Sequence, residues 1–493
     1  MFEVIRILID VLFILNYFFF FIIIFGERRN PRTTWAWLMV TILVPYFGFI
    51  IYLTIGLEAK KYRIFAEKSK HNDTEIFKEY VKIDSKMSNV FEGNFRNINR
   101  KDILKIKGKE HFNDMIYLNL ISDAGAFTDN NEVELYHEGN KKFAQLLEDI
   151  RKAKKFIHMQ YYIFKADALG LKILNALTEK AKEGLEIKLM LDGVGSRGLT
   201  RKKCYLPLVE AGGEVGFFLV TYVNFMRINF RNHRKLAIID GEIGYIGGLN
   251  IGDEYLGIHK RYGFWRDSHI RIRGDAVKQM ELRFIMDWNF SNKKDIIINE
   301  KYFPILSKKK GASMQIVSSG PDTKWPNIHY AYTKMISEAN KYIYIQTPYF
   351  IPDDSIFESL KIAALSGIDV RIIIPGNPDH PFVYWAALSY LGELLEVGVK
   401  CYRYERGFVH SKLMLVDGFI SSVGTANMDI RSFKLNFEIN AFIYDEEVTN
   451  QFEKEFLNDI KHDCTQFLLE EYRKRSSSTK VKESLSRLLS PIL

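Results

Sequence analysis

Cysteine is scarce in this chain, and its placement excludes several kinds of chemistry. Only three cysteines occur among the 493 residues, at Cys204, Cys401 and Cys464, and no two of them form a Cys-x-x-Cys pair. This pattern provides neither a disulfide framework nor a zinc ribbon. The sequence therefore gives no support for a metal site or for redox chemistry, and we expect no cofactor.

The chain also lacks the composition of a disordered scaffold, because 47% of its residues are hydrophobic and 14% are aromatic. A chain of this length can bury a large core and can hold more than one domain. Acidic residues are fewer than basic ones, so the formal net charge is +9. A basic chain favours an anionic partner, and nucleic acid and an anionic membrane are the two main candidates.

Two long apolar runs stand at the amino terminus. The first covers residues 4–25 with Arg6, Asp10 and Asn16 as its strongly polar interruptions, and the second covers residues 35–57 without a charge. Each run, at about 20 residues, is long enough to cross the hydrocarbon core of a bilayer. The first is too long for a cleaved signal peptide and is followed at once by the second. We therefore predict a membrane anchor over residues 1–57 and a multi-pass protein of the cell membrane.

The second run leaves two questions open. Pro45 and Gly48 interrupt it, so a kinked or re-entrant helix is an alternative to a straight span. Basic residues flank the run on both sides, and both flanks compete for the cytoplasmic face under the positive-inside rule. The sequence therefore does not choose the side of the membrane. The flanking residues are Arg28, Arg29 and Arg32 before the run, and Lys60, Lys61 and Arg63 after it.

Two copies of one pattern, His-x-Lys-x4-Asp, lie 177 residues apart, and each is followed at the same spacing by a small-residue turn and an asparagine. Matched copies of this kind indicate a duplicated lobe with paired catalytic groups at the seam between the lobes. The members are His233, Lys235, Asp240 and Asn250 in the first copy, and His410, Lys412, Asp417 and Asn427 in the second.

Other landmarks repeat around the two motifs. Residues 155–162 match residues 341–348, and residues 187–191 match residues 370–374; each is a short β-rich run next to a helical segment. This alternation indicates an α/β architecture in each half. We predict a juxtamembrane linker at 58–115, a first lobe at 116–300, a second lobe at 301–470 and an amphipathic tail at 471–493. The tail lies on the membrane or docks on a lobe, and docking is slightly favoured.

The residues after each motif lysine are apolar, which places each motif on a core strand. Side chains at i and i+2 share a face of a strand, so the histidine and the lysine point toward one pocket. Asp240 and Asp417 lie five positions beyond the lysine, where the strand enters a turn. We count both aspartates with the candidate catalytic residues, although this position favours structural support over proton transfer.

Paired histidines and lysines permit phosphoryl-group chemistry without a metal. One histidine attacks phosphorus when its free nitrogen is aimed by a partner on the other nitrogen. The second histidine protonates the leaving alcohol and then deprotonates the incoming one. Lysines and asparagines hold the non-bridging oxygens as charge develops.

The paired motifs with their trailing asparagines resemble the phospholipase D superfamily, and the whole chain resembles its bacterial cardiolipin synthases. The resemblance implies an α/β fold with two similar lobes, each a mixed sheet flanked by helices, around one shared active site. It also implies a covalent phosphohistidine and phosphatidyl transfer between two phosphatidylglycerol molecules, with release of glycerol. Carried over by position, His233 and His410 are nucleophile and general acid/base in an order left open, Lys235, Lys412, Asn250 and Asn427 bind phosphate, and Glu438 and Asp267 orient the histidines.

Three alternatives remain beside a cardiolipin synthase. A membrane phospholipase D would pass the same intermediate to water or to another alcohol, and the motifs do not separate the two because pocket shape selects the acceptor. A nuclease suits the basic charge, but the apolar runs argue against a nucleic-acid partner. A non-catalytic scaffold is disfavoured by the two intact motifs. Aromatic and other apolar residues before the motifs, among them Phe225 and Met226, suggest an acyl-chain entrance. The oligomeric state is open.

Overall fold

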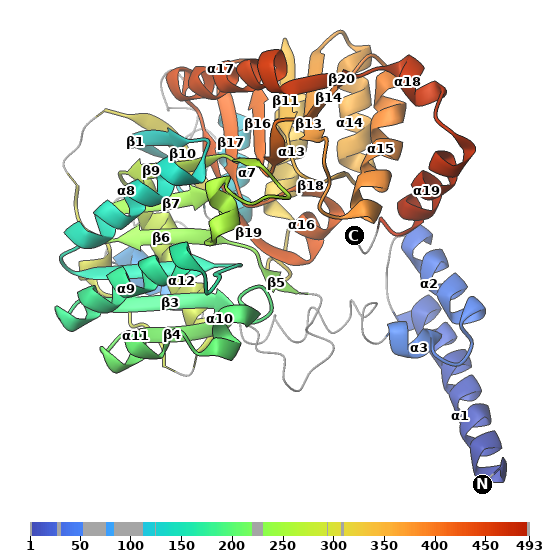
Figure 1. The fold of residues 1–493 in the computed structure, drawn as a ribbon, viewed down its shortest axis with the longest axis horizontal. Coiled ribbons are helices and arrows are strands. Elements are labelled where there is room, and N and C mark those ends of the chain that lie inside the picture. Colours follow the sequence, from blue (N-terminus) through green and yellow to red (C-terminus); the bar gives the residue numbers. More distant parts are fainter. Residues whose placement is uncertain are drawn as a thin grey trace.

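The computed structural model describes residues 2–26, 31–52, 75–82, 112–123, 125–218, 230–292, 294–306 and 310–490. They form an α/β body with a helical hairpin at one side, and the amino terminus lies at the far end of this hairpin (Figure 1). The end of the second apolar run, most of the predicted linker, and Phe225 and Met226 of the suggested acyl-chain entrance fall outside these ranges.

One mixed sheet runs through the body, and its two halves repeat the same strand order, to which the second half adds one strand at its outer edge. The halves meet where β1 pairs antiparallel with β10. The duplicated order confirms two similar lobes, but they share one continuous sheet. In spatial order from its outer edge, the first half contains β4 (Glu214–Phe218), β3 (Glu186–Asp192), β2 (Phe156–Tyr161), β6 (Lys235–Ile239), β7 (Ile243–Gly247), β9 (His269–Arg273) and β1 (Thr128–Tyr136). In the same order, the second half contains β20 (Cys464–Phe467), β14 (Lys400–Tyr404), β13 (Asp369–Pro375), β11 (Tyr342–Gln346), β16 (Leu413–Val416), β17 (Ile420–Gly424), β19 (Asn436–Ile443) and β10 (Ala312–Ser319).

The strands expected from the sequence repeats are present. β2 and β11 lie within the matched residues 155–162 and 341–348, and β3 and β13 cover the next matched pair. β2 pairs parallel with β3 and antiparallel with β6, and β11 pairs in the same way with β13 and β16. Such central strands have neighbours on both edges and helices on their faces, which explains their nearly continuous apolar sequences.

Helices cover both faces of this sheet. α8 and α9 pack on one face of the first half and α12 on the other, while α13 and α14 pack on β10 and β13, and α17 packs on β14, β16 and β17. The bounds are α8 (Gly139–Lys152), α9 (Ala168–Lys182), α10 (Arg197–Lys202), α11 (Leu206–Glu210), α12 (Ala276–Ser291), α13 (Asn327–Ser337), α14 (Asp354–Leu365), α15 (Pro381–Glu396), α16 (Ile430–Lys434) and α17 (Glu446–Asp463), with 3-10 turns η5 (Asp253–Leu256) and η6 (Glu300–Tyr302).

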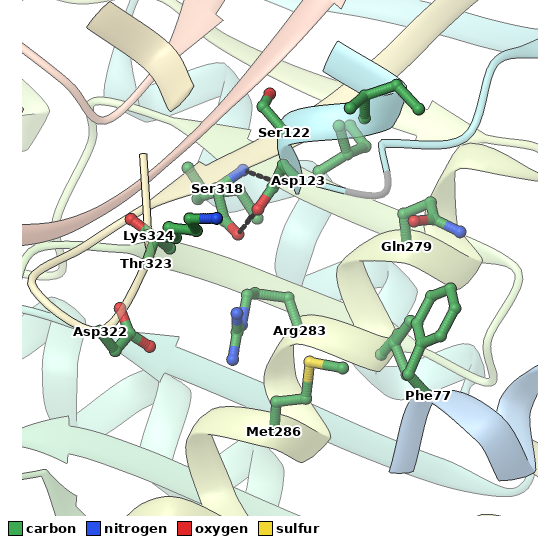
Figure 2. A pocket seen from close by; sticks show the side chains of 14 residues that line it. Phe77, Ser122, Asp123, Gln279, Arg283, Met286, Ser318, Asp322, Thr323 and Lys324 are labelled. Atoms are coloured by element: carbon green, nitrogen blue, oxygen red, sulfur yellow. Dashed lines mark hydrogen bonds between the residues drawn. The ribbon is translucent and has the colours of Figure 1, made fainter. Parts of the chain in front are cut away.

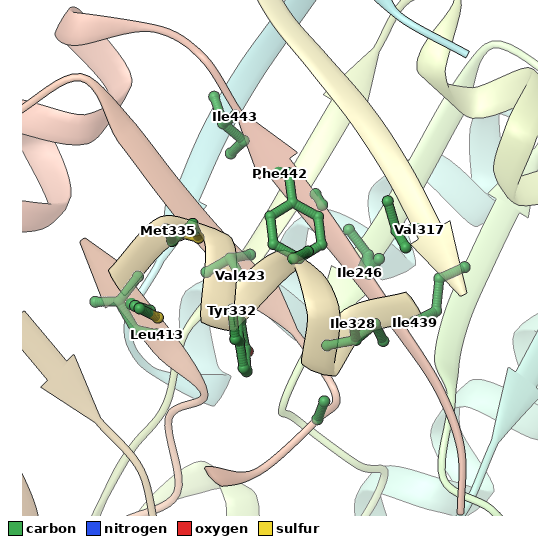
Figure 3. Packing of buried hydrophobic residues seen from close by; sticks show 14 of the residues in the cluster. Ile246, Val317, Ile328, Tyr332, Met335, Leu413, Val423, Ile439, Phe442 and Ile443 are labelled. Carbon is green, nitrogen blue, oxygen red and sulfur yellow. The ribbon is translucent and has the colours of Figure 1, made fainter. Parts of the chain in front are cut away.

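Apolar packing ties the two halves together. Tyr332 and Met335 of α13 lie with Phe442 of β19 and Ile246 of the first-half strand β7 in one buried cluster (Figure 3). α7 (Asn113–Asp123) starts just before the predicted lobe boundary at residue 116 and packs on β10 and α13, in the second half. The sequence limits of the domains remain predictions, because a shared sheet and core leave no separable lobe.

The amino-terminal hairpin contains α1 (Phe2–Phe21), which continues as a π-helical turn at Ile22–Gly26, then α2 (Pro31–Leu43) and α3 (Gly48–Ile51). Among the described residues, one helix, Glu3–Phe25, is long and apolar enough to cross a membrane. The second predicted span is broken between α2 and α3, next to Pro45, as the kinked alternative expects. Asn16 of α1 donates to the Thr41 carbonyl at 2.8 Å and accepts from the Phe49 amide at 3.1 Å, so it satisfies backbone groups on both sides of the break.

The carboxyl-terminal segment folds back onto the second half through α18 (Leu469–Arg473) and α19 (Ser477–Leu488). α19 docks on α15 and buries Glu483, whose carboxylate accepts from Arg475 at 2.8 Å. The apolar side chains of Val481, Leu485 and Leu488 stay exposed, with Leu488 at 75%. Arg487 of α19 also forms an ion pair with Glu393 of α15, so the helix docks through polar contacts and leaves its apolar residues facing outward.

Candidate active site

Two short strand pairs cross between the halves and deliver the motif histidines to one place. β5 (Arg231–Asn232) pairs parallel with the start of β19, and the His233 amide donates to the Phe437 carbonyl at 2.9 Å. β15 (Gly407–Val409) pairs parallel with β8 (Phe264–Arg266), and the His410 amide donates to the Arg266 carbonyl at 2.7 Å. β12 (Phe350–Ile351) and β18 (Met428–Asp429) form a further short pair.

This arrangement corrects the prediction that each histidine lies within a core strand. β6 begins at Lys235 and β16 begins at Leu413, so His233 and His410 precede the strands. The reason is that the backbone at each histidine is bonded to a strand of the opposite half. The apolar residues of the sequence predicted the two strands but not the residue at which each strand begins.

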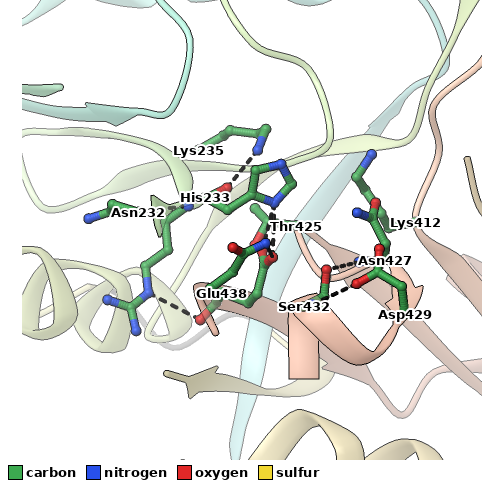
Figure 4. Close-up of polar contacts among 12 residues, drawn as sticks. Asn232, His233, Lys235, Lys412, Thr425, Asn427, Asp429, Ser432 and Glu438 are labelled. Carbon is green, nitrogen blue, oxygen red and sulfur yellow. Dashed lines mark hydrogen bonds and ion pairs between the residues drawn. The ribbon is translucent and has the colours of Figure 1, made fainter. Parts of the chain in front are cut away.

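Each histidine is also held by an acid of the opposite half. Nδ1 of His233 lies 2.9 Å from Oε1 and 3.0 Å from Oε2 of Glu438 (Figure 4). Nδ1 of His410 lies 2.9 Å from Oδ2 of Asp267, whose other oxygen accepts from the Ser268 amide at 2.7 Å. A carboxylate accepts only, so Nδ1 carries the proton and Nε2 keeps its lone pair.

Burial keeps both imidazoles neutral. Burial outweighs the carboxylate of Glu438 and, with the charges of Lys235 and Lys412, lowers the pKa of His233 to about 4. Burial and Lys412 lower the pKa of His410 to about 3, against the effect of Asp267. Burial opposes ionisation of Glu438, but His233 and Lys235 outweigh it and lower the pKa of this acid. Each imidazole thus keeps a free lone pair on Nε2, the form required for nucleophilic attack.

The motif lysines lie beside both histidines. Burial and the charge of Lys412 lower the pKa of Lys235 to about 7, and burial lowers the pKa of Lys412 to about 8. Each ammonium donates to the carbonyl of its own motif histidine, Lys235 to His233 at 2.6 Å and Lys412 to His410. A lysine has three N–H donors, so each has further donors for an anionic group.

The motif aspartates lie elsewhere and fix the sheet. Asp240 accepts from the amides of Lys154, Lys155 and Phe156, which lead into β2, at 2.7 to 3.1 Å. Asp417 accepts in the same way from residues 340–342, which lead into β11, at 2.7 to 2.8 Å. Both have a left-handed backbone, with φ of 56° and 55°. These contacts favour the structural interpretation over a catalytic one.

The two asparagines differ in their surroundings. Oδ1 of Asn250 accepts from the Ile163 amide at 3.2 Å and its Nδ2 donates to the Tyr255 hydroxyl at 3.3 Å. Asn427 is 4% exposed, and its Oδ1 has no hydrogen-bond partner among the described residues. The hydroxyl of Ser432 accepts from the Asn427 backbone amide at 3.2 Å, and the backbone amide of Ser432 donates to Oδ1 of Asp429 at 2.6 Å (Figure 4).

Aromatic rings beside the histidines were not foreseen from the sequence. The ring of Tyr162 lies 5.0 Å from that of His233, edge to face, and the ring of Trp265 lies 5.4 Å from that of His410. Both residues stand next to sequence landmarks, since Tyr162 ends the repeat at 155–162 and Trp265 is two positions before Asp267. Their position next to these landmarks was the sequence signal from which the two aromatic residues could have been predicted as part of the site.

A cavity of about 320 Å³ lies on the other side of β19 from the histidines. Ile439 lines it, whereas the preceding residue, Glu438, contacts His233, and neighbouring residues on a strand point to opposite faces. Phe77, Arg283 and Asp123 also line it (Figure 2), and burial raises the pKa of Asp123 to about 7. This cavity is therefore separate from the candidate active site.

Comparison with known proteins agrees with this geometry. The family described as "Cardiolipin synthase, PLD-like domain" matches residues 146–288 and 332–460, which carry the two motifs. A second family, described as "Phospholipase_D-nuclease N-terminal", matches residues 14–56. The chain belongs to the phospholipase D-like cardiolipin synthase family.

Curated relatives align with the chain from end to end. A cardiolipin synthase of Oceanobacillus iheyensis is 46% identical over 488 residues, covering 99% of both chains. Another from Listeria welshimeri is 49% identical over 491 residues with the same coverage, and one from Staphylococcus aureus is 47% identical over 98% of this chain and 95% of its own. A crystal structure of phosphatidylserine synthase from Haemophilus influenzae shares the fold, with a TM-score of 0.59, 15% identity and coverage of 77% of this chain and 100% of that chain.

Proposed function

We propose that this protein is a membrane-bound phosphatidyltransferase that makes cardiolipin and glycerol from two molecules of phosphatidylglycerol. Membership of the cardiolipin synthase family supports the reaction, as do relatives of that name with which it aligns over nearly its whole length. The observation that carries the mechanism is the pair of neutral buried histidines, each held at Nδ1 by an acid of the opposite half.

In the first step Nε2 of one histidine attacks the phosphorus of phosphatidylglycerol. A nitrogen–phosphorus bond forms, and the bond from phosphorus to the headgroup glycerol breaks. The other histidine must be protonated to give its proton to this glycerol as it leaves. The incoming anionic phosphate and the orienting acid both favour that protonated form, although burial disfavours it in the free site.

In the second step the second histidine removes a proton from a hydroxyl of another phosphatidylglycerol. The resulting oxygen attacks phosphorus, the nitrogen–phosphorus bond breaks, and cardiolipin leaves with the first histidine free. Because the second histidine regains its proton in this step, the cycle needs no other co-reactant. The same intermediate attacked by water gives phosphatidic acid, so exclusion of water decides between transfer and hydrolysis.

Lys235 and Lys412 hold the non-bridging oxygens of the phosphate in this mechanism. Both ammonium groups are buried beside the histidines, where they attract the phosphate oxygens more strongly than they would in water. Asn427 has a buried amide oxygen without a hydrogen-bond partner among the described residues, while its side chain also hydrogen-bonds Asp429. Asn250 has partners at both ends of its amide, so it must exchange the Tyr255 contact to bind phosphate.

The substrate also requires a membrane surface, and the hairpin supplies the anchor. α1 is long enough to cross the bilayer, and α2 with α3 forms a broken second span next to it. We infer that both enter the membrane as a multi-pass anchor, and that Leu485 and Leu488 of α19 rest on its surface. Basic residues on the same segment, such as Lys480 and Lys482, complement anionic lipid.

Product analysis tests this function. The purified full chain in vesicles of labelled phosphatidylglycerol should release cardiolipin and glycerol, whereas phosphatidic acid as sole product would establish a hydrolase instead. His233→Ala and His410→Ala should each abolish turnover, and only one of them should still trap a labelled phosphohistidine. His462→Ala, at an exposed position on α17, is the matched control and should retain activity.

A further inference from the structure

The two orienting acids are themselves held in place by two matching sets of buried polar side chains. Each set contains a glutamine from a central strand, an aspartate from a helix and an arginine that bonds the backbone of the acid. We refer to them as the first clamp, made of Gln160, Asp287 and Arg234, and the second clamp, made of Gln346, Asp459 and Arg266.

The first clamp ends on Glu438. Nε2 of Gln160 donates to Oδ2 of Asp287 at 2.7 Å, and both oxygens of Asp287 accept from the guanidinium of Arg234. Nε of Arg234 then donates to the Glu438 carbonyl at 3.1 Å. Arg234 is 0% and Asp287 2% exposed. This ion pair is therefore almost completely removed from water, so solvent does not replace a contact that is broken.

The second clamp ends on Asp267. Nε2 of Gln346 donates to Oδ2 of Asp459 at 2.9 Å, and the two oxygens of Asp459 accept from Nε of Arg266 at 2.8 and 3.2 Å. A terminal nitrogen of Arg266 donates to the Asp267 carbonyl at 2.6 Å. Here too the glutamine, the arginine and the aspartate are buried.

The clamps are equivalent in part and different in part. Gln160 pairs in the sheet with Leu236 and Gln346 with Leu413, each one residue after a motif lysine. The arginines, however, come from unrelated positions: Arg234 directly follows His233, whereas Arg266 directly precedes Asp267. Duplication alone would place the two arginines at equivalent positions of the two halves. Two arginines from different positions that reach the same backbone atom of the acid indicate that this contact itself is required.

We propose that Asp287 and Asp459 are positioning residues, each fixing through its arginine the acid that orients one of the two catalytic histidines. The inference rests on the proposed function, since it gives the histidines their reactive role. A carboxylate directs an imidazole only when its own backbone is fixed, and a displacement of about 1 Å costs about 100-fold in rate.

The first experiment measures whether each clamp acts through its own acid. Asp287→Asn and Asp459→Asn in the reconstituted full chain should lower kcat for cardiolipin formation by about 10- to 100-fold with little change in KM. In a Glu438→Gln background, Asp287→Asn should add almost no further loss, whereas Asp459→Asn should keep its full effect. Equal losses from both variants in that background would show a general structural role and overturn the proposal.

The second experiment does not depend on turnover, so it separates failure of the clamps from failure of the proposed function. Diethyl pyrocarbonate modifies neutral imidazole, and peptide mass spectrometry follows His233 and His410 separately. Loss of the orienting carboxylate lowers the pH midpoint of the affected histidine. Asp287→Asn should shift the midpoint of His233 alone and Asp459→Asn that of His410 alone, and unchanged midpoints would refute the proposal even if the wild type makes no cardiolipin.

Each asparagine variant leaves a buried arginine without its counter-ion and loses stability. Gln160→Leu and Gln346→Leu therefore serve as milder variants, because they leave both ion pairs intact and remove one hydrogen bond each. They should shift the same histidine in the same direction, with a several-fold loss of kcat. A loss of melting temperature without any histidine-specific effect would again leave only a structural role.

Discussion

The acid that controls His233 lies 205 positions away in the other half of the chain, and replacing it tests the crossed arrangement directly. Glu438→Gln keeps the shape of the side chain but removes its charge, and the amide presents a donor as well as an acceptor to Nδ1. The two contacts at 2.9 and 3.0 Å then no longer select the tautomer with a free Nε2. Asp267→Asn does the same to His410.

The magnitude follows from the burial of the pair. Glu438 is 0% exposed, so water does not replace the lost contact. A hydrogen bond to a charged group contributes about 1.5–3 kcal/mol. Since about 1.4 kcal/mol corresponds to tenfold in rate, the loss of orientation alone predicts cardiolipin formation about 10- to 150-fold slower. The wrong tautomer and the weaker support of a protonated imidazole add to this factor.

The assay is the initial rate of cardiolipin formation from labelled phosphatidylglycerol in mixed micelles. Glu281→Gln is the matched control, because Glu281 holds His158 at 2.7 Å in an equally buried pair that involves neither motif histidine. It should lower the melting temperature but leave kcat of the folded enzyme unchanged. Folded Glu438→Gln protein with less than a threefold loss, or an equal loss in Glu281→Gln, would refute the orienting role.

Three further predictions follow from the contacts of single residues. Asp417→Asn should destabilise the protein by about 1–3 kcal/mol in denaturant unfolding while the folded fraction keeps its kcat, because Asp417 holds three backbone amides rather than substrate; a selective loss of kcat would restore a catalytic role. His233 titrates at about 6.5 in the unfolded chain and about 4 in the folded one, so the unfolded state binds more protons in between. Stability should fall as pH drops from 6.5 to 4, and melting curves of His233→Gln should show a shallower decline. Leu488→Glu should slow turnover of vesicle lipid more than of soluble short-chain lipid; equal slowing on both would reject contact of α19 with the bilayer.

The sequence predicted the motif residues and the strands that follow them, because both depend on local patterns. Continuous apolar runs after Lys235 and Lys412 identify core strands, and their repetition identifies two lobes. The sequence also favoured the structural role of the aspartates, from their odd distance along the strand. It named Glu438 and Asp267 as orienting acids by family resemblance alone, without telling which histidine each one serves.

Contacts between distant segments explain what the sequence did not reveal. The partner of His233 depends on β5 pairing with β19, a two-residue contact that leaves no periodic signal. Asp287 and Asp459 stand on helices, where an aspartate ordinarily indicates a solvated face, and only the fold shows them buried. The role of Asn16 at the break after α2 likewise requires both apolar segments to be side by side.

The crossed contacts also explain why the two lobes share one chain. Each half supplies a histidine whose backbone amide and Nδ1 are held by the other half, so neither half contains a complete catalytic group. A single lobe would need a second copy to work, and two identical copies would give both histidines identical surroundings. Fusion removes that constraint and lets the halves diverge. His233 is followed by Arg234 of the first clamp, whereas His410 is followed by Ser411, whose hydroxyl bonds that of Ser268 at 2.6 Å. In the proposed mechanism, such differences would give one histidine the surroundings of a nucleophile and the other those of an acid, a division of roles that two identical lobes do not permit.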